Sequence, residues 1–142
     1  MKNKILTLEK AKKIASALKT KNKKIILCHG VFDLLHIGHI DYLAESKSVA
    51  DTLIVSITED KYVNKGPNRP VFNQIQRARA IASLESVDYV LINHSPDAIN
   101  LIKSIKPNLY SKGSDYKDLS ADITGMIKKE KDAVKSVGGN IY

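Results

Sequence analysis

Ten consecutive residues in the first third of the chain combine side chains suited to binding phosphate. The segment from Gly30 to His39 reads Gly-Val-Phe-Asp-Leu-Leu-His-Ile-Gly-His, so two imidazoles, one carboxylate and two glycines lie close together. Residues 24–29 before it have the apolar pattern of a buried parallel strand, and residues 40–47 after it have the pattern of a helix. A strand, a glycine-containing turn and a helix N-terminus present free backbone N–H groups to an anion. The sequence therefore predicts a phosphate site.

The two histidines of this segment indicate what the site could do. His36 and His39 are three residues apart on the first helical turn, which predicts that both imidazoles face the same ligand. Gly38 between them removes a side chain where a phosphate must approach the backbone. Zinc binding is a competing interpretation, but no third His, Cys or carboxylate stands at a supporting spacing. A pair of histidines without a ligand is the other alternative, and the turn of residues 30–33 favours phosphate chemistry over both.

Length and composition predict one soluble, cytoplasmic domain. The chain has 142 residues, no apolar stretch near the roughly 20 residues of a membrane span, and no signal-peptide pattern. Its one cysteine, Cys28, cannot form an intrachain disulfide and lies in a predicted core strand. We therefore expect no membrane association.

The net charge of +8 raises the possibility of nucleic-acid binding, so its location matters. Residues 1–24 hold nine lysines and one glutamate, which accounts for the whole excess, and the rest of the chain is neutral. A nucleic-acid-binding protein is expected to carry a basic stripe on its folded body and aromatic side chains for base stacking. The chain contains no Trp, and its lysines gather on one predicted helix. We therefore expect no nucleic-acid partner.

Helical and strand patterns alternate along the chain, which predicts a parallel sheet with right-handed crossovers. The expected fold is α/β, a single Rossmann-like doubly wound domain of about five parallel strands with helices on both faces. Residues 1–23 form an N-terminal basic helix with its flanks, capped by Thr7, and residues 24–142 form the core. The expected strands are 24–29, 52–57, 89–92, 108–111 and the start of a fifth at 140–142. The other expected helices begin near 38, 73, 95 and 122.

Two local patterns indicate where one helix begins and which face of another helix is buried. The run Ser95-Pro96-Asp97 predicts a helix start, with Ser95 as the cap and Pro96 in the first turn. In the helix of residues 73–84, the apolar spacing predicts that Ile75, Ala78, Ile81 and Ala82 face inward. In parallel sheets ligands bind at the carboxyl ends of the strands, so the segment after the first strand would lie in the site if that strand is central.

Three further segments match one family together with the first. Gly30-x-Phe-Asp-x-x-His-x-Gly-His39 is followed by Asn64-Lys-Gly-Pro-Asn-Arg-Pro-Val71, by Gln76-Arg77 and by Lys112-Gly-Ser-Asp-Tyr116. These segments resemble the signature, mobile loop, helix pair and nucleoside segment of the HxGH nucleotidyltransferase superfamily, the cytidylyltransferase-like enzymes. The segment 112–116 is similar to the heptose 1-phosphate adenylyltransferase branch. The resemblance covers nearly the whole chain.

The resemblance implies nucleotidyl transfer, in which an acceptor phosphate attacks the α-phosphorus of a nucleoside triphosphate and pyrophosphate leaves. It implies that His36, His39 and Lys65 are the catalytic residues. The implied nucleotide-binding residues are Gly30, Val31, Phe32, Gly38, Lys112, Gly113 and Asp115. The implied acceptor- or phosphate-binding residues are Asp33, Arg69 and Arg77. Asp33 has the alternative role of orienting the turn. A Mg²⁺ ion is expected with the triphosphate, because it needs few protein ligands.

The resemblance also implies substrates and partners. The segment 112–116 favours ATP over CTP, and the branch implies a sugar 1-phosphate such as heptose 1-phosphate as the acceptor, in surface carbohydrate biosynthesis. Cytidylyl transfer to glycerol 3-phosphate and a non-catalytic nucleotide-binding module remain the alternatives. The block Asp122-Ile-Thr-Gly125 with Gly138-Gly139 resembles members fused to a ribokinase-type sugar kinase. A homodimer is expected.

Two departures from the family pattern stand out. His29 occupies a position where the heptose branch commonly shows Asn, so the identity of the acceptor is left open. The superfamily usually carries a Ser/Thr-rich motif after the fifth strand, whose hydroxyls bind the β- and γ-phosphates. The sequence stops at Tyr142 before such a motif, so we expect a piece of a longer polypeptide.

Overall fold

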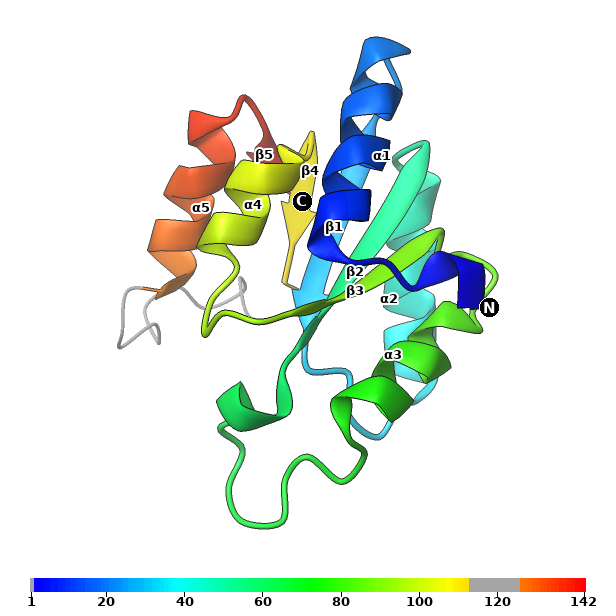
Figure 1. Ribbon diagram of the computed structural model, residues 1–142, viewed down its shortest axis with the longest axis vertical. Helices are drawn as coiled ribbons and strands as arrows, with labels where there is room; N and C mark the ends of the chain where they lie inside the picture. Colours follow the sequence, from blue (N-terminus) through cyan, green and yellow to red (C-terminus); the bar gives the residue numbers. More distant parts are fainter. Residues whose placement is uncertain (1, 113–125) are drawn as a thin grey trace.

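Five parallel strands form one sheet that is covered by helices (Figure 1). The computed structural model describes residues 2–112 and 126–142. The strands are β1 (Ile25–Gly30), β2 (Thr52–Thr58), β3 (Tyr89–Asn93), β4 (Leu109–Ser111) and β5 (Asn140–Ile141). The helices are α1 (Leu8–Thr20), α2 (Ile37–Ser48), α3 (Gln74–Ala82), α4 (Ile99–Ile105) and α5 (Met126–Ser136), with short 3-10 turns η1 (Lys2–Lys4) and η2 (Asp60–Tyr62). The predicted α/β alternation is confirmed, and the predicted start of the last helix at 122 lies outside the described residues.

The strand order places β1 at the centre of the sheet. The order is β3-β2-β1-β4-β5, and every pairing is parallel. The chain steps outward from β1 to β2 and β3, and then crosses back to β4 on the other side of β1. The strand order therefore reverses at β1, which is the position where doubly wound sheets bind their ligands. The segment that follows Gly30 begins at this carboxyl edge, as the sequence requires for a site.

Alternate residues of the strands build two apolar layers, one on each face of the sheet. On β1, Ile25 and Leu27 point into the first layer and Ile26 and Cys28 into the second, all with no exposed surface. Helices α1, α4 and α5 cover the first layer, and α2 and α3 cover the second, as Figure 1 shows on either side of the sheet. Both faces of β1 are therefore buried away from solvent, which explains its unbroken apolar sequence.

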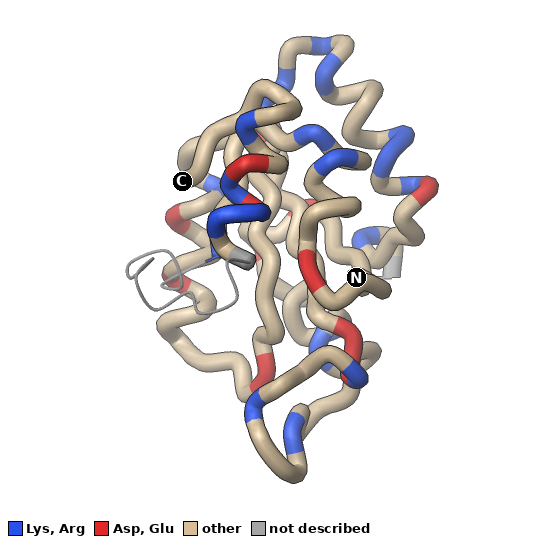
Figure 2. The backbone as a smooth tube through the Cα atoms, turned by 90° about the vertical axis from the view of Figure 1, so that its left-hand side faces the viewer, with Lys and Arg blue, Asp and Glu red and all other residues tan. Residues whose placement is uncertain are grey.

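The basic N-terminal helix is part of this core. Thr7 caps α1 as predicted, accepting a hydrogen bond from the backbone N–H of Lys10 at 3.3 Å. Ala11 and Ala15 are buried in the first layer, and the backbone N–H of Leu6 donates to the carbonyl of Val90 on β3. Lysines lie along α1 in Figure 2, at the upper end of the molecule, and further basic residues lie on the loop at its lower end.

Two local predictions are wrong. Helix α4 begins at Ile99 rather than near Ser95, and its N-cap Ala98 has no side-chain cap. The amide of Asn93 donates to the carbonyls of Ser95 and Asp97, and Glu130 of α5 accepts the N–H of Ala98. These contacts hold residues 95–98 in a bend. The carboxylates of Asp97 and of the distant Glu130 accept the N–H groups of Ile99 and Ala98, in place of the predicted serine cap.

The second error concerns the inward face of α3. Ile75 is 56% exposed, because the buried face is formed by Arg77, Ala78, Ile81 and Ala82. Because Arg77 is on the buried face of α3, Ile75 lies on the exposed side of the helix. Among the helices of residues 2–112 and 126–142, none has the length and apolar character to cross a membrane.

Candidate active site

A cavity of about 710 Å³ opens at the carboxyl end of β1. Ten of the predicted site residues line it: Gly30, Val31, Phe32, Asp33, His36, Gly38, His39, Lys65, Arg69 and Lys112. They come from the β1–α2 turn, the N-terminus of α2, the loop after η2 and the end of β4. The fold thus brings together segments that are up to about eighty residues apart in the sequence. Gly113 and Asp115 lie outside the described residues.

The two histidines form the start of α2 itself. His36 is the N-cap, and its Nδ1 accepts the backbone N–H of Gly38 at 3.0 Å. His39 is the third helical residue, and its Nδ1 accepts the backbone N–H of His36 at 3.2 Å. This reciprocal arrangement is a capping box built from imidazoles. Because each Nδ1 accepts a hydrogen bond, the neutral ring carries its proton on Nε2. Both side chains are therefore left with an N–H donor for a ligand.

The rings lie against one another and are held close to the backbone. Their centroids are 4.0 Å apart, and the edge of Phe32 contacts His39 with a centroid distance of 5.7 Å. Burial, followed by the charges of His36 and Lys65, lowers the pKa of His39 below its ordinary value of 6.5. The His39 ring is therefore neutral near pH 7, in the protonation state in which its Nδ1 can cap the helix.

The structure gives a steric reason for the glycine at position 38. A Cβ built on Gly38 would lie 2.7 Å from Cε1 of His36, so any side chain there would displace the imidazole. The turn before it is also unusual, because Phe32 and Leu34 both have a φ of 52°, in the left-handed region. The turn thus winds tightly enough to place the N-terminus of α2 beside the end of β1.

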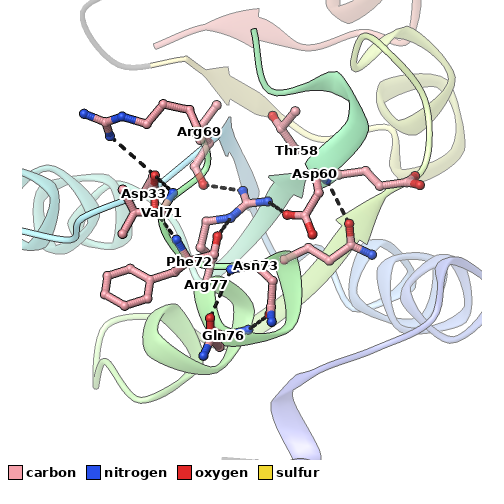
Figure 3. A network of polar contacts seen from close by, with 12 residues as sticks. Asp33, Thr58, Asp60, Arg69, Val71, Phe72, Asn73, Gln76 and Arg77 are labelled. Carbon is pink, nitrogen blue, oxygen red and sulfur yellow. Dashed lines mark hydrogen bonds and ion pairs between the residues drawn. The ribbon is translucent and has the colours of Figure 1, made fainter. Parts of the chain in front are cut away.

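Asp33 anchors the loop that carries Lys65. Its carboxylate accepts the backbone N–H groups of Val71 at 2.7 Å and Phe72 at 3.0 Å, and Arg69 lies 3.5 Å from it (Figure 3). Partial burial raises the pKa of Asp33, but the hydrogen bonds from these three residues and from the backbone of Leu34 together lower it below 3.8. The geometry matches the alternative role of orienting the turn.

Replacing Asp33 by asparagine is expected to loosen this loop. An amide has one acceptor oxygen where the carboxylate has two, so one of the two backbone N–H groups loses its partner. We expect trypsin to cut after Lys65 about 5- to 10-fold faster, corresponding to the loss of one hydrogen bond. Asp41→Asn is the control, because it removes the same charge from an exposed residue at the rim of the same cavity. Equal cleavage rates in the two variants would contradict the anchoring role.

Arg77 has a different position from the predicted one. It is 1% exposed and does not line the cavity, so in this structure it is not placed to bind an acceptor or a phosphate. Its guanidinium donates to the carbonyls of Phe72 at 2.9 Å and Val31 at 2.8 Å, and to the carboxylate of Asp60 at 2.6 Å (Figure 3). One side chain thus ties the β1–α2 turn to both ends of the Lys65 loop.

Lys112 is held in the cavity wall by a buried carboxylate. Its Nζ lies 3.3 Å from Glu130 of α5, whose side chain has no exposed surface. Glu130 also accepts hydrogen bonds from the hydroxyl of Tyr110 and the N–H of Ala98, both at 3.0 Å. A buried carboxylate needs such partners to offset its desolvation. Helix α5 therefore fixes the position of a cation that faces the site.

His29 forms part of the cavity wall at the end of β1. It is 5% exposed, and its Nδ1 lies 2.6 Å from the hydroxyl of Ser56 on β2. Burial, followed by the charge of Lys112, lowers the pKa of His29 from 6.5 to about 3. Its imidazole is therefore neutral at physiological pH.

The buried His29 is expected to make the fold sensitive to acid. Below pH 6.5 the unfolded chain gains a proton at His29, whereas the folded chain stays neutral there until the pH approaches about 3. The free energy of unfolding thus falls, by up to about 1.4 kcal/mol per pH unit from this residue. Urea denaturation between pH 4.5 and 7.5 measures this effect. The free energy of unfolding should fall less steeply with decreasing pH in His29→Gln than in the wild type. Parallel curves for the two proteins would show that His29 does not cause the loss.

The structure adds residues to the cavity that the motifs did not predict. Tyr42, Glu45, Ser111 and Tyr142 also line it, and the hydroxyl of Tyr42 donates to Ser111 at 2.8 Å. One signal was available, because Tyr42 and Glu45 continue the three-residue spacing of the histidines along the same face of α2. Ser111 and Tyr142 carry no such signal, since only the pairing of β4 with β1 and β5 brings them to the site.

The described residues contain no group of three or more His, Cys, Asp or Glu side chains that could hold a metal ion. The cavity does contain Lys65, Arg69 and Lys112, which suit a polyphosphate. A divalent cation held mainly by phosphate oxygens and water fits such a wall, because Mg²⁺ requires one or two protein ligands at most.

Comparisons with known proteins agree with this arrangement. A family model described as Cytidylyltransferase-like matches residues 27–139. Bifunctional protein HldE of Aliarcobacter butzleri is 44% identical over 138 residues, which are 95% of this chain and 29% of that protein. The HldE protein of Geobacter metallireducens is 37% identical over 97% of this chain and 27% of its own length. The chain thus spans less than a third of the curated relatives it matches.

Two solved structures have the same fold. A lipopolysaccharide core biosynthesis protein from Thermoplasma volcanium superposes with a TM-score of 0.67 at 28% identity, over 84% of this chain and 92% of that one. A pantoate-beta-alanine ligase from Francisella tularensis superposes with a TM-score of 0.66 at 21% identity, over 97% of this chain and 65% of that one. The family model covers most of the chain, including the second half of β1, the imidazole-capped helix α2 and Lys112. The chain therefore belongs to the cytidylyltransferase-like family of nucleotidyltransferases.

Proposed function

We propose that the chain transfers AMP from ATP to a sugar 1-phosphate, such as heptose 1-phosphate, and releases pyrophosphate. The observation that carries this proposal is the cavity at the end of β1, where the two capping imidazoles share one wall with Lys65 and Lys112. The choice of adenylyl transfer and of a heptose acceptor rests on the resemblance of segment 112–116 and on the likeness to the HldE proteins. The likeness to a lipopolysaccharide core biosynthesis protein supports a role in the synthesis of surface carbohydrate.

The geometry supports a direct displacement at phosphorus. An oxygen of the acceptor phosphate forms a bond to the α-phosphorus, and the bond from that phosphorus to the bridging oxygen breaks. Pyrophosphate leaves with the electron pair, so no protein group needs to form a covalent bond. Such a reaction depends on positioning and on stabilising the charge on phosphate oxygens.

Four residues of the site have roles in this displacement. The Nε2–H groups of His36 and His39 donate to phosphate oxygens, because their Nδ1 atoms are committed to capping α2. Lys65 is carried by the loop that Asp33 anchors, and its ammonium follows the charge that moves toward pyrophosphate. Lys112, fixed by Glu130, contributes a second positive charge from β4. A Mg²⁺ ion that enters with ATP supplies further charge neutralisation.

The proposal is tested by measuring pyrophosphate release from the purified 142-residue chain. We expect release with ATP, Mg²⁺ and a heptose 1-phosphate together, and none when one of them is omitted. The sugar product should carry AMP by mass spectrometry. Release with CTP and glycerol 3-phosphate, but not with ATP and heptose 1-phosphate, would overturn the assignment of substrates. Binding of ATP without turnover in any combination would favour a non-catalytic module instead.

We also propose that the chain forms a homodimer, that it is fused to a sugar kinase, and that it is located in the cytoplasm. Light scattering of the chain, and the gene sequence that encodes it, test the first two of these.

A further inference from the structure

One polar atom in the cavity wall has no use in the mechanism above. His29 lies at the end of the central strand, directly before Gly30, and is 5% exposed. It lines the cavity, whereas Ser56, its neighbour on β2, does not. Its Nδ1 lies 2.6 Å from the Ser56 hydroxyl, so this nitrogen faces the interior of the sheet. The remaining nitrogen, Nε2, has no hydrogen-bond partner within the described part of the chain.

An unpaired polar atom at this depth costs free energy that a ligand can recover. A buried donor or acceptor left without a partner destabilises a protein by about 1–3 kcal/mol. Most such atoms in native proteins are paired with protein groups or ordered water. A nitrogen held in place by Ser56, in the wall of a cavity lined by substrate-binding side chains, is therefore suited to pairing with a substrate group.

The charge of the site restricts what that group can be. The imidazole of His29 is uncharged at neutral pH, because burial and Lys112 lower its pKa to about 3. Lys65, Arg69 and Lys112 already supply cations for phosphates in the same cavity. In either tautomer of the uncharged ring, Nε2 can pair with a hydroxyl, because a hydroxyl both donates and accepts a hydrogen bond, whereas phosphate oxygens only accept.

We propose that His29 is a specificity-determining residue whose Nε2 hydrogen-bonds a sugar hydroxyl of a substrate in the cavity, with Ser56 holding the ring. This inference rests on the proposed function, because that function supplies the sugar. Two sources offer the same chemistry, the ribose of the nucleotide and the sugar of the acceptor.

Two amide variants separate the two nitrogens of the ring. Asparagine places a polar atom near the position of Nδ1, so His29→Asn keeps a partner for Ser56 but has none at the position of Nε2. Glutamine reaches the position of Nε2. Calorimetric titration measures the affinity of wild type, His29→Asn and His29→Gln for each of three ligands: ATP, heptose 1-phosphate and inorganic pyrophosphate. Pyrophosphate serves as a probe that has phosphates but no hydroxyl.

We expect His29→Asn to bind either ATP or heptose 1-phosphate about tenfold more weakly, corresponding to one lost hydrogen bond. Pyrophosphate binding should stay unchanged, and His29→Gln should bind within about threefold of the wild type. If ATP is the ligand affected, 2′-deoxy- or 3′-deoxy-ATP should bind wild type and His29→Asn equally, which assigns the hydroxyl to ribose. If heptose 1-phosphate is affected, the hydroxyl belongs to the acceptor.

Three results would overturn the inference. The first is unchanged affinity of His29→Asn for both hydroxyl-bearing ligands, or no binding of either ligand to the wild type. The second is an equal loss for pyrophosphate, which would mean that the cavity has been deformed. The third is failure of glutamine to restore binding. These titrations do not depend on turnover, so a lack of pyrophosphate release would overturn the proposed function and leave this inference to be judged by binding.

Discussion

Replacing His39 by glutamine, or His36 by asparagine, is expected to lower kcat/KM for pyrophosphate release by about 10²–10³ while the protein stays folded. The loss follows from removing one N–H donor aimed at the reacting phosphates, because in each variant the amide takes over the cap made by Nδ1 and no aromatic ring holds an N–H at the position of Nε2. A loss of this size is typical of charge-stabilising donors. The fold is expected to survive, because asparagine is among the best N-cap residues and glutamine completes a capping box at the third helical position. Pyrophosphate release and thermal melting of the same samples measure both effects.

Alanine variants at the same positions complete this experiment. His36→Ala should lose as much activity as His36→Asn and, in addition, about 0.5–2 kcal/mol of stability, since the cap is then missing. His94→Gln is the matched control, because His94 is an exposed histidine whose side chain contacts Glu59 outside the cavity. It should leave the activity unchanged. If His36→Asn kept most of the wild-type rate, the imidazole would serve only as a cap.

Replacing Arg77 by methionine is expected to cost about 1–3 kcal/mol of stability, the range for leaving hydrogen-bonding groups without a partner, because Asp60 at the other end of the ion pair is 40% exposed. The change leaves the carbonyls of Val31 and Phe72 and the carboxylate of Asp60 without their shared donor. Lysine cannot replace it fully, because one ammonium lacks the planar fork that reaches three acceptors. Urea denaturation followed by circular dichroism gives the free energy of unfolding.

The same variant should also release the loop of Lys65. Its two ends, at Asp60 and Phe72, are both tied to Arg77, so trypsin should cut this loop faster in Arg77→Met than in wild type. Arg79→Met is the control on the same helix, because Arg79 is exposed, and its cost should stay within about 0.5 kcal/mol. A cost below about 1 kcal/mol for Arg77→Met would contradict the role assigned to it.

The sheet and its layers could be predicted because strands and helices are encoded by local patterns. Each strand is a short apolar run, and the amphipathic helices between them fix the parallel, doubly wound arrangement. The start of α4 could not be predicted in this way. Ser95 and Pro96 carry a strong local signal for a helix start, but Glu130 binds the N–H of Ala98 from more than thirty residues away. A tertiary contact therefore replaced the local cap.

The candidate site also has features that follow from local sequence and features that depend on tertiary contacts. The arrangement of His36 and His39 follows from the sequence, because both capping hydrogen bonds join residues two or three positions apart on one helical turn. The likeness to the family then brought Lys65 and Lys112 into the prediction. The role of Arg77 did not follow, since an arginine in a family motif indicates phosphate binding equally well whether it is exposed or buried.

By itself, then, the sequence determined the parallel fold, the phosphate-binding turn and the family. Only the tertiary structure decided that Asp33 anchors the loop at Val71 and Phe72, that Arg77 ties Val31 to Asp60, and that His29 is held by Ser56. The physical reason is the range of the contacts. Hydrogen bonds within one turn are set by residue spacing, whereas partners that lie from 17 to 46 positions apart meet only when the strand order and the packing of the helices are fixed.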